Sequence, residues 1–263
     1  MASDVRELRA LYLDTMEKIL CNSIYRDPSF IPNQTAHAPY DSELREHGKD
    51  WPVHAHTMIG LRRLRHLREC VETVLQDGVP GDLIEAGVWR GGASIMMRAV
   101  LAAYGVRDRL VWLADSFCGL PPPNPERYPH DLGMHFEGFS DLAVPLDVVK
   151  DNFERYGLLD ESVRFLPGLF AQTLVGIPSS RFAVIRLDGD LYESTIDSLD
   201  ALYPKLAPGG FAVIDDYGVY PACRAAVDDY RDRNGVVEPI HDIDWAGAFW
   251  RKSRRRDARG VVA

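Results

Sequence analysis

The stretch from Asp82 to Ser94, with the sequence Asp-Leu-Ile-Glu-Ala-Gly-Val-Trp-Arg-Gly-Gly-Ala-Ser, constrains the fold of this chain more than any other. It begins with a short apolar run that is typical of a buried strand, and it ends where a helix begins. Gly87, Gly91 and Gly92 allow the backbone to approach a ligand without a Cβ atom in the way. The free N–H groups of the helix would point back at that ligand. The stretch therefore predicts a nucleotide-type cradle at the carboxyl end of a first strand.

The glycines of this cradle do not follow the G-x-G-x-x-G fingerprint of dinucleotide-binding proteins. Glu85 lies just before the turn, where its charge would repel a pyrophosphate and would suit a ligand with hydroxyl or ammonium groups. A plain glycine turn in an α/β crossover explains the stretch equally well when it is considered alone.

Apolar runs and helical segments alternate after Gly81. Strands are predicted at 82–86, 110–115, 163–166, 182–188 and 210–215. Two further short strands, near 236–240 and 247–251, lie close enough together to form a hairpin at the sheet edge. This order predicts an α/β fold with a mostly parallel sheet and helices on both faces.

Two helices are predicted ahead of this core, at 5–25 and 54–77, from apolar residues at helical spacing. A turn-rich, irregular arm over residues 27–51 separates them. Thr57 is expected to cap the second helix. The longest stretch without predicted secondary structure is 119–144, whose aromatic and histidine residues favour a lid over disorder.

The composition argues against several classes of partner. The 263 residues carry a net charge of −9, with an isoelectric point near 5.4, which disfavours nucleic acid or an anionic membrane as the main partner. No apolar run approaches the ~20 residues of a membrane span. Residues 1–10 lack the apolar core of a signal peptide, so a cytoplasmic protein is expected. Four scattered cysteines without a C-x-x-C pair predict free, mostly buried thiols.

Two of the predicted strands end in closely spaced aspartates. Asp188 and Asp190 follow one strand, and Asp215 and Asp216 follow the next. Because the carboxyl ends of parallel strands lie at one edge of a sheet, we expect the four carboxylates to converge and repel one another. A hard divalent cation such as Mg²⁺, Ca²⁺ or Mn²⁺ would compensate this charge with oxygen ligands. Helix capping is the alternative, but it explains only one aspartate for each strand.

Other polar residues near the strand ends have two interpretations each. Gly189 allows a bend, so that one neighbouring carboxylate can bind metal while the other accepts a proton from a substrate hydroxyl. Asp115 ends the second strand, where an acidic residue typically binds ribose hydroxyls, although it can also cap the next turn. Arg186 either faces the sheet edge or pairs with a carboxylate. The tyrosines after the strand ends either line an acceptor pocket or pack internally: Tyr192, Tyr217 and Tyr220.

These motifs together resemble the macrocin O-methyltransferase family. The similarity rests on Glu85-Ala-Gly-Val-Trp-Arg-Gly-Gly92, Ala114-Asp-Ser-Phe117, Arg186-Leu-Asp-Gly-Asp-Leu-Tyr192, Ile214-Asp-Asp-Tyr217, Ala55-His-Thr-Met-Ile-Gly60 and Asn152-Phe-Glu-Arg-Tyr-Gly-Leu-Leu159. It extends from the first helix to Trp250. The resemblance implies a class I methyltransferase (Rossmann-like) fold, with a mostly parallel seven-stranded sheet, extra N-terminal helices and a lid loop.

The resemblance also implies an activity. Members of the family are S-adenosylmethionine- and Mg²⁺-dependent enzymes that methylate sugar hydroxyls of glycosylated secondary metabolites, such as macrolides and aminocoumarins. They are usually homodimers or larger assemblies. The loop between Pro121 and Phe139 does not align with the family pattern, so the resemblance leaves the acceptor open.

Residue by residue, the resemblance assigns a role to each matched position. For the cofactor turn it implies Glu85, Gly87, Val88 and Trp89. For the ribose and adenosine it implies Asp115 and Ser116, and for the methionine part Thr57 and Met58. For Mg²⁺ it implies Asp188, Asp215 and Asp216, with Asp190 as the general base.

The sequence therefore predicts an O-methyltransferase that acts on a sugar hydroxyl. An enzyme for a catechol-like phenol and a non-catalytic nucleotide-binding regulator are the alternatives. No repeat or linker divides residues 1–263, so we expect one domain: an N-terminal helical cap at 1–80, a Rossmann-like core at 81–251 and a basic tail at 252–263.

Overall fold

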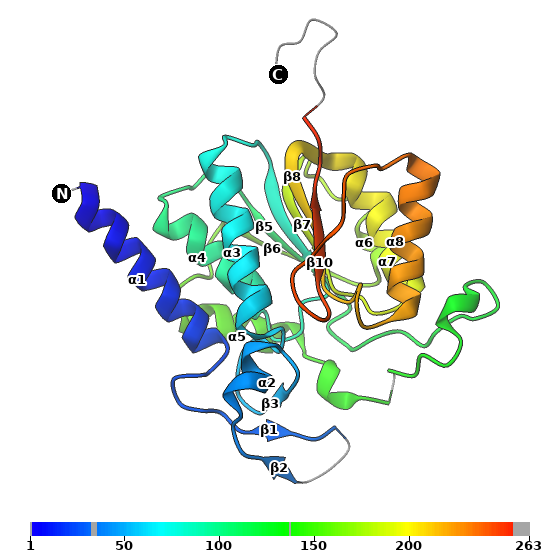
Figure 1. Cartoon of the computed structure of the whole chain (residues 1–263), viewed down its shortest axis with the longest axis horizontal. Helices are drawn as coiled ribbons and strands as arrows, with labels where there is room; N and C mark the ends of the chain where they lie inside the picture. Colours follow the sequence, from blue (N-terminus) through cyan, green and yellow to red (C-terminus); the bar gives the residue numbers. More distant parts are fainter. Residues whose placement is uncertain (1, 33–35, 137, 255–263) are drawn as a thin grey trace, which may run out of the picture.

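The computed structural model of this chain describes residues 2–32, 36–136 and 138–254. Most of the predicted basic tail, residues 255–263, lies outside the described residues. Within them, strands and helices alternate from β4 onwards around one central sheet (Figure 1). The predicted α/β fold is confirmed.

The central sheet has seven strands in the order β6-β5-β4-β7-β8-β10-β9. The parallel strands are β4 (Asp82–Ala86), β5 (Val111–Asp115), β6 (Val163–Pro167), β7 (Phe182–Leu187) and β8 (Leu206–Ile214). Strand β10 (Ala248–Arg251) pairs antiparallel with β8 and with β9 (His241–Asp242). The strand order reverses between β4 and β7, and in doubly wound sheets the ligand crevice lies at the carboxyl ends beside such a point.

Helices cover both faces of the sheet, as predicted. One face carries α1 (Ala2–Leu20), α3 (Gly60–Gln76), α4 (Gly92–Ala103) and α5 (Leu146–Arg155). The other face carries α6 (Phe170–Thr173), α7 (Tyr192–Leu202) and α8 (Pro221–Asn234). The described residues also include short 3₁₀ helices: η1 (Pro129–Asp131), η2 (Ser140–Leu142) and η3 (Tyr203–Lys205). None of the described helices has the length and apolar character needed to span a membrane.

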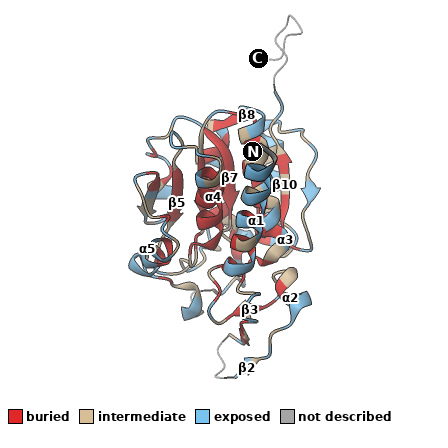
Figure 2. Ribbon diagram, turned by 90° about the vertical axis from the view of Figure 1, so that its left-hand side faces the viewer, coloured by how far each residue is buried: buried red, intermediate tan, exposed pale blue. Residues whose placement is uncertain are grey.

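The alternating side chains of the strands form two separate hydrophobic layers. On β4, Leu83 packs with the first helix layer and Ile84 with the second. On β7, Val184 and Ile185 divide in the same way. Figure 2 shows the buried strands together with a buried α4, while much of α1 remains exposed. Successive apolar side chains of a strand therefore point to opposite faces of the sheet, and each face has its own hydrophobic layer.

The segment between α1 and α3 differs from the irregular arm that was predicted. It contains a three-stranded antiparallel sheet, β2-β1-β3, formed by β1 (Ser29–Phe30), β2 (His37–Ala38) and β3 (Trp51–Pro52), together with α2 (Ser42–Glu46). Buried Arg45 holds this cap together. Its guanidinium pairs with Asp50 at 2.7 Å and donates to the carbonyl oxygens of Cys21 and Asp27. Cys21 and Asp27 are distant from Arg45 in sequence, and Asp50 lies beyond the end of α2, so helical periodicity did not reveal these partners.

Several predicted boundaries are wrong. The first helix ends at Leu20 rather than at residue 25, because Asn22 adopts a left-handed φ of 48°, which is incompatible with a continuing α-helix. The second helix begins at Gly60 rather than at residue 54, and its N-cap is Ile59 instead of Thr57. The strand predicted near 236–240 lies at 241–242, since Pro239 has no N–H group for a strand ladder.

The four cysteines are free thiols, as predicted. Cys21, Cys70 and Cys223 are buried. Cys118 is exposed and lies just after the end of β5.

Gly87 allows the carboxyl ends of β4 and β7 to touch through their backbones. A Cβ atom at Gly87 would lie 1.7 Å from the carbonyl oxygen of Asp188, and the φ of Gly87 is 93°. The N–H group of Asp188 donates to the carbonyl oxygen of Ala86 at 2.8 Å. The glycine turn and the strand that carries Asp188 are therefore in direct contact.

Replacing Gly87 with alanine is expected to lower the free energy of unfolding by about 3 kcal/mol or more, because a steric clash adds to the backbone strain. Gly105→Ala is the matched control. Gly105 also has a positive φ, of 68°, but no described atom lies within 4 Å of its added Cβ. Its substitution should cost about 1 kcal/mol. Urea denaturation measures both variants, and equal losses would contradict the close approach at Gly87.

Candidate active site

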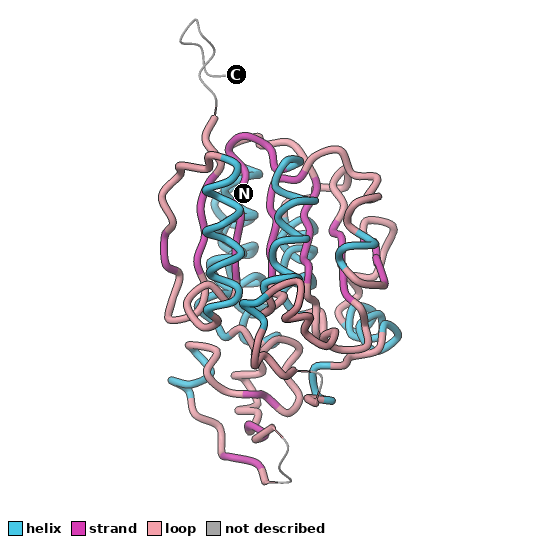
Figure 3. Tube along the Cα trace, turned by 90° about the vertical axis from the view of Figure 1, so that its right-hand side faces the viewer, coloured by secondary structure: helices cyan, strands magenta, loops and turns pink. Residues whose placement is uncertain are grey.

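All twelve residues predicted for the site line one cavity of about 390 Å³ at the carboxyl edge of the sheet. They are Thr57, Met58, Glu85, Gly87, Val88, Trp89, Asp115, Ser116, Asp188, Asp190, Asp215 and Asp216. Figure 3 shows the loops gathered beyond this edge of the strands. The structure therefore brings together residues that are spread over most of the chain.

The glycine turn after β4 is held from two sides. Asp115 accepts hydrogen bonds from the backbone N–H of Val88 and from that of Phe117, both at 2.7 Å. The Asp115 carboxylate thus caps the turn that follows β5 and also fixes the cofactor turn. On the other side, Gly92 donates to the carbonyl oxygen of His56 at 2.9 Å, which places Thr57 beside the start of α4. The predicted role of Asp115 at a ribose stays a prediction.

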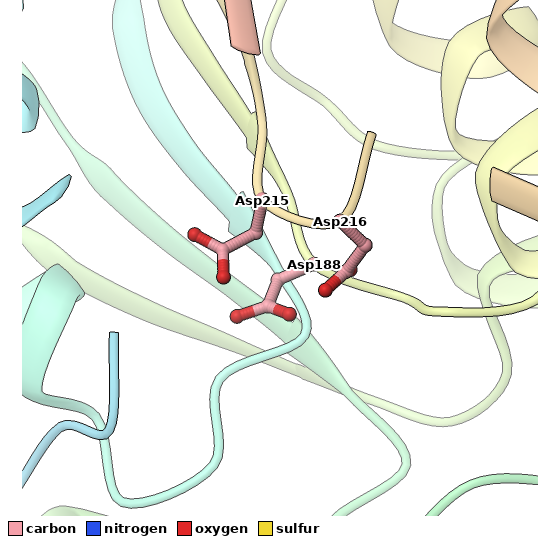
Figure 4. A group of neighbouring side chains, drawn as sticks. All are labelled: Asp188, Asp215 and Asp216. Carbon is pink, nitrogen blue, oxygen red and sulfur yellow. The ribbon is translucent and has the colours of Figure 1, made fainter. Parts of the chain in front are cut away.

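Asp188, Asp215 and Asp216 form an acidic cluster. Each offers a carboxylate oxygen, and these three oxygens all lie within 4.8 Å of one another. Figure 4 shows the carboxylates gathered around one point at the ends of β7 and β8. Asp190 lies beside the cluster, and its backbone N–H donates to Asp216 at 3.3 Å.

Helix capping does not account for these aspartates. The N-cap residue of α7 is Leu191 and that of α8 is Tyr220, and neither helix start receives a hydrogen bond from its own N-cap side chain. The first N–H groups of α7 instead donate to Asp131, a residue of the 119–144 loop. Asp190 and Asp216 are therefore available for other roles.

Arg186 is the ion-pair partner of several carboxylates, so its predicted edge-facing alternative is wrong. Its side chain is 1% exposed. Its guanidinium nitrogens lie 2.6 Å from Glu85, 2.9 Å from Asp188 and 2.5 Å from Asp215. The carboxylate of Glu85 also accepts a hydrogen bond from Ser94. Glu85 is thus held from both sides inside the cavity wall.

Sequence reasoning missed a second buried cation at the site, Arg63. It donates to the second oxygen of Asp215, and its Nε lies 3.3 Å from Asp244. A signal was present in the sequence, because Arg63 falls on the apolar stripe of α3. The buried residues of that helix are Gly60, Arg63, Leu64, Leu67, Cys70, Val71 and Val74. A charge on a buried helix face requires a partner.

Burial shifts the pKa values of the carboxylates at this site. It raises the pKa of Asp188 to about 6, with a further increase from Asp215, and the pKa of Glu85 to about 7. Burial, followed by neighbouring carboxylates, raises the pKa values of Asp190 and Asp216 well above the ordinary range. Together with Asp215, these residues make five carboxylates. Among the described residues, the ion pairs of this group are formed with the guanidinium groups of Arg63 and Arg186 alone.

Negative charge is therefore in excess at the cluster, and either protons or a cation must neutralise it. An all-oxygen ligand set suits Mg²⁺, Ca²⁺ or Mn²⁺. The cluster residues fit such an ion.

Aromatic side chains form the outer wall of the cavity. They come from the N-terminal cap, the 119–144 loop, the first residue of α6 and the loops after β8 and β9: Trp51, Phe136, Phe139, Phe170, Tyr220 and Trp245. Tyr220 thus lies where an acceptor-pocket residue was expected. Tyr192 and Tyr217 instead donate hydrogen bonds to Asp229 and Asp228, away from the cavity lining.

The topology and the site define the class of this protein. The sheet reverses its order beside a glycine turn, the neighbouring strand ends in an acidic residue, and an antiparallel strand lies between β8 and β9. This combination defines a class I methyltransferase. The chain belongs to the macrocin-O-methyltransferase (TylF) family, whose sequence model matches residues 9–252. It is therefore an O-methyltransferase, for which S-adenosylmethionine is the methyl donor, and the non-catalytic regulator alternative is wrong.

Curated relatives and a solved structure cover nearly the whole chain. The chain is 57% identical to the 8-demethyl-8-(2,3-dimethoxy-alpha-L-rhamnosyl)-tetracenomycin-C 4'-O-methyltransferase of Streptomyces olivaceus, over 95% of each protein. It is 50% identical to the mycinamicin III 3''-O-methyltransferase of Micromonospora griseorubida, over 92% of this chain and 96% of that one. The solved structure of the O-methyltransferase NovP is similar with a TM-score of 0.89 and 48% identity, over 94% of this chain and 100% of that one.

Mg²⁺ is expected to raise the melting temperature more strongly at pH 7 than at pH 5, because the cation binds deprotonated carboxylates. Without a cation, Asp188 holds its proton more tightly in the folded chain than in the unfolded one. Its contribution to the free energy of unfolding therefore declines as the pH rises from 3.8 to about 6. A bound cation should offset that decline. It should raise the free energy of unfolding by about 2.7 kcal/mol when the Mg²⁺ concentration exceeds the Kd a hundredfold.

Thermal denaturation with and without Mg²⁺, from pH 5 to pH 7.5, measures this effect. Asp216→Asn should remove the dependence on Mg²⁺, whereas Asp147→Asn, which changes an exposed carboxylate, should retain it. A shift that is absent in the unsubstituted protein, or that survives in Asp216→Asn, would reject the cluster as a metal site.

Proposed function

We propose that this enzyme transfers a methyl group from S-adenosylmethionine to a sugar hydroxyl of a glycosylated secondary metabolite of the antibiotic type, with Mg²⁺ bound at the aspartate cluster. The observation that carries the proposal is that one cavity contains both the glycine turn and the cluster, with Asp190 beside it. The sugar as acceptor is supported by the relative from Streptomyces olivaceus, whose name specifies a rhamnosyl group.

The donor would be held by the residues around the glycine turn. These are Thr57, Met58, Glu85, Gly87, Val88, Trp89, Asp115 and Ser116, all of which line the cavity. Glu85 and Asp115 provide carboxylates that suit the ammonium group and the ribose hydroxyls of the donor. The sulfonium methyl group would then face the carboxylates of the cluster.

In the proposed reaction, the acceptor hydroxyl oxygen forms a bond to the methyl carbon while the bond from that carbon to sulfur breaks. The electron pair of the broken bond stays on sulfur, and Asp190 accepts the hydroxyl proton. The products are a methyl ether and S-adenosylhomocysteine. Burial and the neighbouring Asp188 and Asp215 raise the pKa of Asp190, which strengthens its carboxylate as a proton acceptor.

A divalent cation held by Asp188, Asp215 and Asp216 would supply Lewis acidity, which lowers the pKa of a hydroxyl. The two arginines keep the cluster residues in place. Arg186 contacts Asp188 and Asp215, and Arg63 contacts the other oxygen of Asp215. Positioning and charge stabilisation are therefore the main contributions expected from the protein.

The test of this function compares two acceptor classes. The purified enzyme is incubated with S-adenosylmethionine, Mg²⁺ and either 8-demethyl-8-(2,3-dimethoxy-alpha-L-rhamnosyl)-tetracenomycin C or catechol. Both compounds are analysed for methyl ethers by mass spectrometry. We expect a methyl ether of the glycoside and none of catechol. Methylation of catechol alone would favour the phenol alternative and reject the sugar acceptor.

Asp190→Asn is expected to lower kcat by about 10²- to 10⁴-fold, the usual contribution of a general base. Affinity for S-adenosylmethionine, measured by calorimetry, should change by less than about twofold, because Asp190 accepts the proton and does not bind the donor. Asp242→Asn, which changes an exposed carboxylate on β9, is the control. If Asp190→Asn turns over at the rate of that control, Asp190 is not the base.

We also propose that the enzyme is a homo-oligomer in which α1 packs against α1 of a second copy. The helix presents exposed apolar residues at coiled-coil spacing: Val5, Leu8, Tyr12 and Ile19, with Thr15 completing the row. The face that packs on the core, through Leu13, Met16 and Leu20, lies about a quarter of a turn around the helix from this row. No charged residue interrupts the exposed row, and an identical helix is complementary to it under twofold symmetry.

Leu8→Glu should convert the oligomer to a monomer, because the new charge would lie in the apolar contact. Light scattering after size-exclusion chromatography measures the mass. Val237→Glu is the control, since Val237 is 86% exposed and follows α8 in the chain. A monomeric unsubstituted enzyme, or an unchanged mass in Leu8→Glu, would contradict this assembly.

A further inference from the structure

Residues 119–136 form a strap that connects β5 to the outer wall of the cavity. Gly119, Leu120 and Pro121 line the cavity at one end of the strap, and Phe136 lines it at the other. Between them, η1 packs against α7 and α8. The strap thus leaves the cavity, touches the helices behind it and returns.

Asp131, at the end of η1, is fully buried although its neighbours in the strap are mostly exposed. Its carboxylate accepts a hydrogen bond from the backbone N–H of Tyr192 at 2.6 Å and from that of Glu193 at 3.1 Å. These are the first two residues of α7, whose own N-cap residue, Leu191, makes no side-chain cap. Asp131 therefore caps α7 from a distant part of the chain.

Ring contacts reinforce this attachment. The imidazole of His130 stacks on the ring of Tyr192, with centroids 5.3 Å apart and planes at 14°, and the ring of Tyr128 lies 5.6 Å from the same tyrosine. The hydroxyl of Tyr192 is fixed in turn by Asp229 of α8. The attachment of the strap is thus built on two helices.

The attachment lies between two parts of the site. On one side, α7 begins two residues after Asp190, whose φ of 57° is a left-handed conformation that its surroundings must maintain. On the other side, Phe136 follows Asp131 after five residues and packs edge-on against Tyr220, with centroids 5.3 Å apart. One buried carboxylate therefore connects the turn of Asp190 to the aromatic wall.

We propose that Asp131 is a positioning residue for the acceptor: by capping α7 it fixes the strap so that Phe136 and Tyr220 form the wall against which the acceptor binds. This inference rests on the proposed function, because it assumes that the acceptor occupies the space between that wall and Asp190. Asp131 does not line the cavity itself, so its effect is exerted through the strap.

The experiment compares Asp131→Ala with Asp131→Asn and with Glu126→Ala. Asparagine keeps a carbonyl oxygen for one of the two N–H groups. Glu126→Ala is the matched control, since Glu126 is an exposed carboxylate of the same strap outside the cavity lining. Arg127 is the one tryptic site within residues 119–136, so cleavage after it reports directly on how firmly the strap is held.

Four quantities are measured for each variant: the tryptic cleavage rate after Arg127, the KM for the rhamnosyl-tetracenomycin acceptor, kcat, and the Kd for S-adenosylmethionine. For Asp131→Ala we expect cleavage and KM to rise about tenfold, in line with the loss of an N-cap, while the donor Kd changes less than twofold. Asp131→Asn should fall between Asp131→Ala and the unsubstituted enzyme. Glu126→Ala should match the unsubstituted enzyme in all four.

Two outcomes would overturn the proposal. Cleavage and KM within twofold of Glu126→Ala would show that the cap does not hold the strap. A donor Kd that worsens as much as the acceptor KM would show that Asp131 only stabilises the fold. If the unsubstituted enzyme methylates no glycoside, the proposed function fails instead, and the cleavage rates still decide whether Asp131 holds the strap.

Discussion

The site depends on one buried guanidinium. Arg186 lies in the middle strand of the sheet, where it is almost inaccessible to water, and pairs with carboxylates from the ends of three strands: Glu85, Asp188 and Asp215. An unpaired charge at this depth would be costly, and so would each carboxylate without its partner. The ion pairs therefore fix the relative positions of the glycine turn and the acidic cluster. Arg63 extends the same network to α3 and to Asp244 in the loop between β9 and β10.

Ion pairs alone do not bring the donor and acceptor sites together; the site also depends on close backbone contact between neighbouring strands. Gly87 and Asp188 approach so closely that only a residue without a Cβ atom fits, which places the turn after β4 directly against the end of β7. Asp115 completes this arrangement from the other neighbouring strand through the N–H of Val88. Methyl transfer needs its reacting atoms in line at short distance, and backbone contact between adjacent strands provides that precision better than flexible loops would.

Local patterns in the sequence predicted the core of the fold well and its periphery poorly. The strand predicted at 82–86 coincides with β4, because its buried residues carry a strong apolar signal. The strand predicted at 163–166 agrees with β6 to within one residue, although β6 is only partly buried. The cap around Arg45 and the roles of Arg63 and Asp131 depend on partners far along the chain, and Asp131 lies 61 residues from Tyr192. The aspartates at the strand ends were predictable because parallel topology alone brings them together. The sequence offered Arg186 as the partner of a carboxylate, but it could not predict which carboxylates Arg186 and Arg63 contact, since periodicity does not specify which charges pair.

The distribution of thiols has a practical consequence. Cys118, at the beginning of the loop that lines the cavity, is exposed, whereas Cys21, Cys70 and Cys223 are buried. Maleimide reagents react with accessible thiols, so the native protein offers a single attachment point for a fluorophore or spin label without engineered cysteines. Such a probe would lie at the beginning of the 119–144 loop, just after β5, and its spectrum would report movement of that loop during turnover.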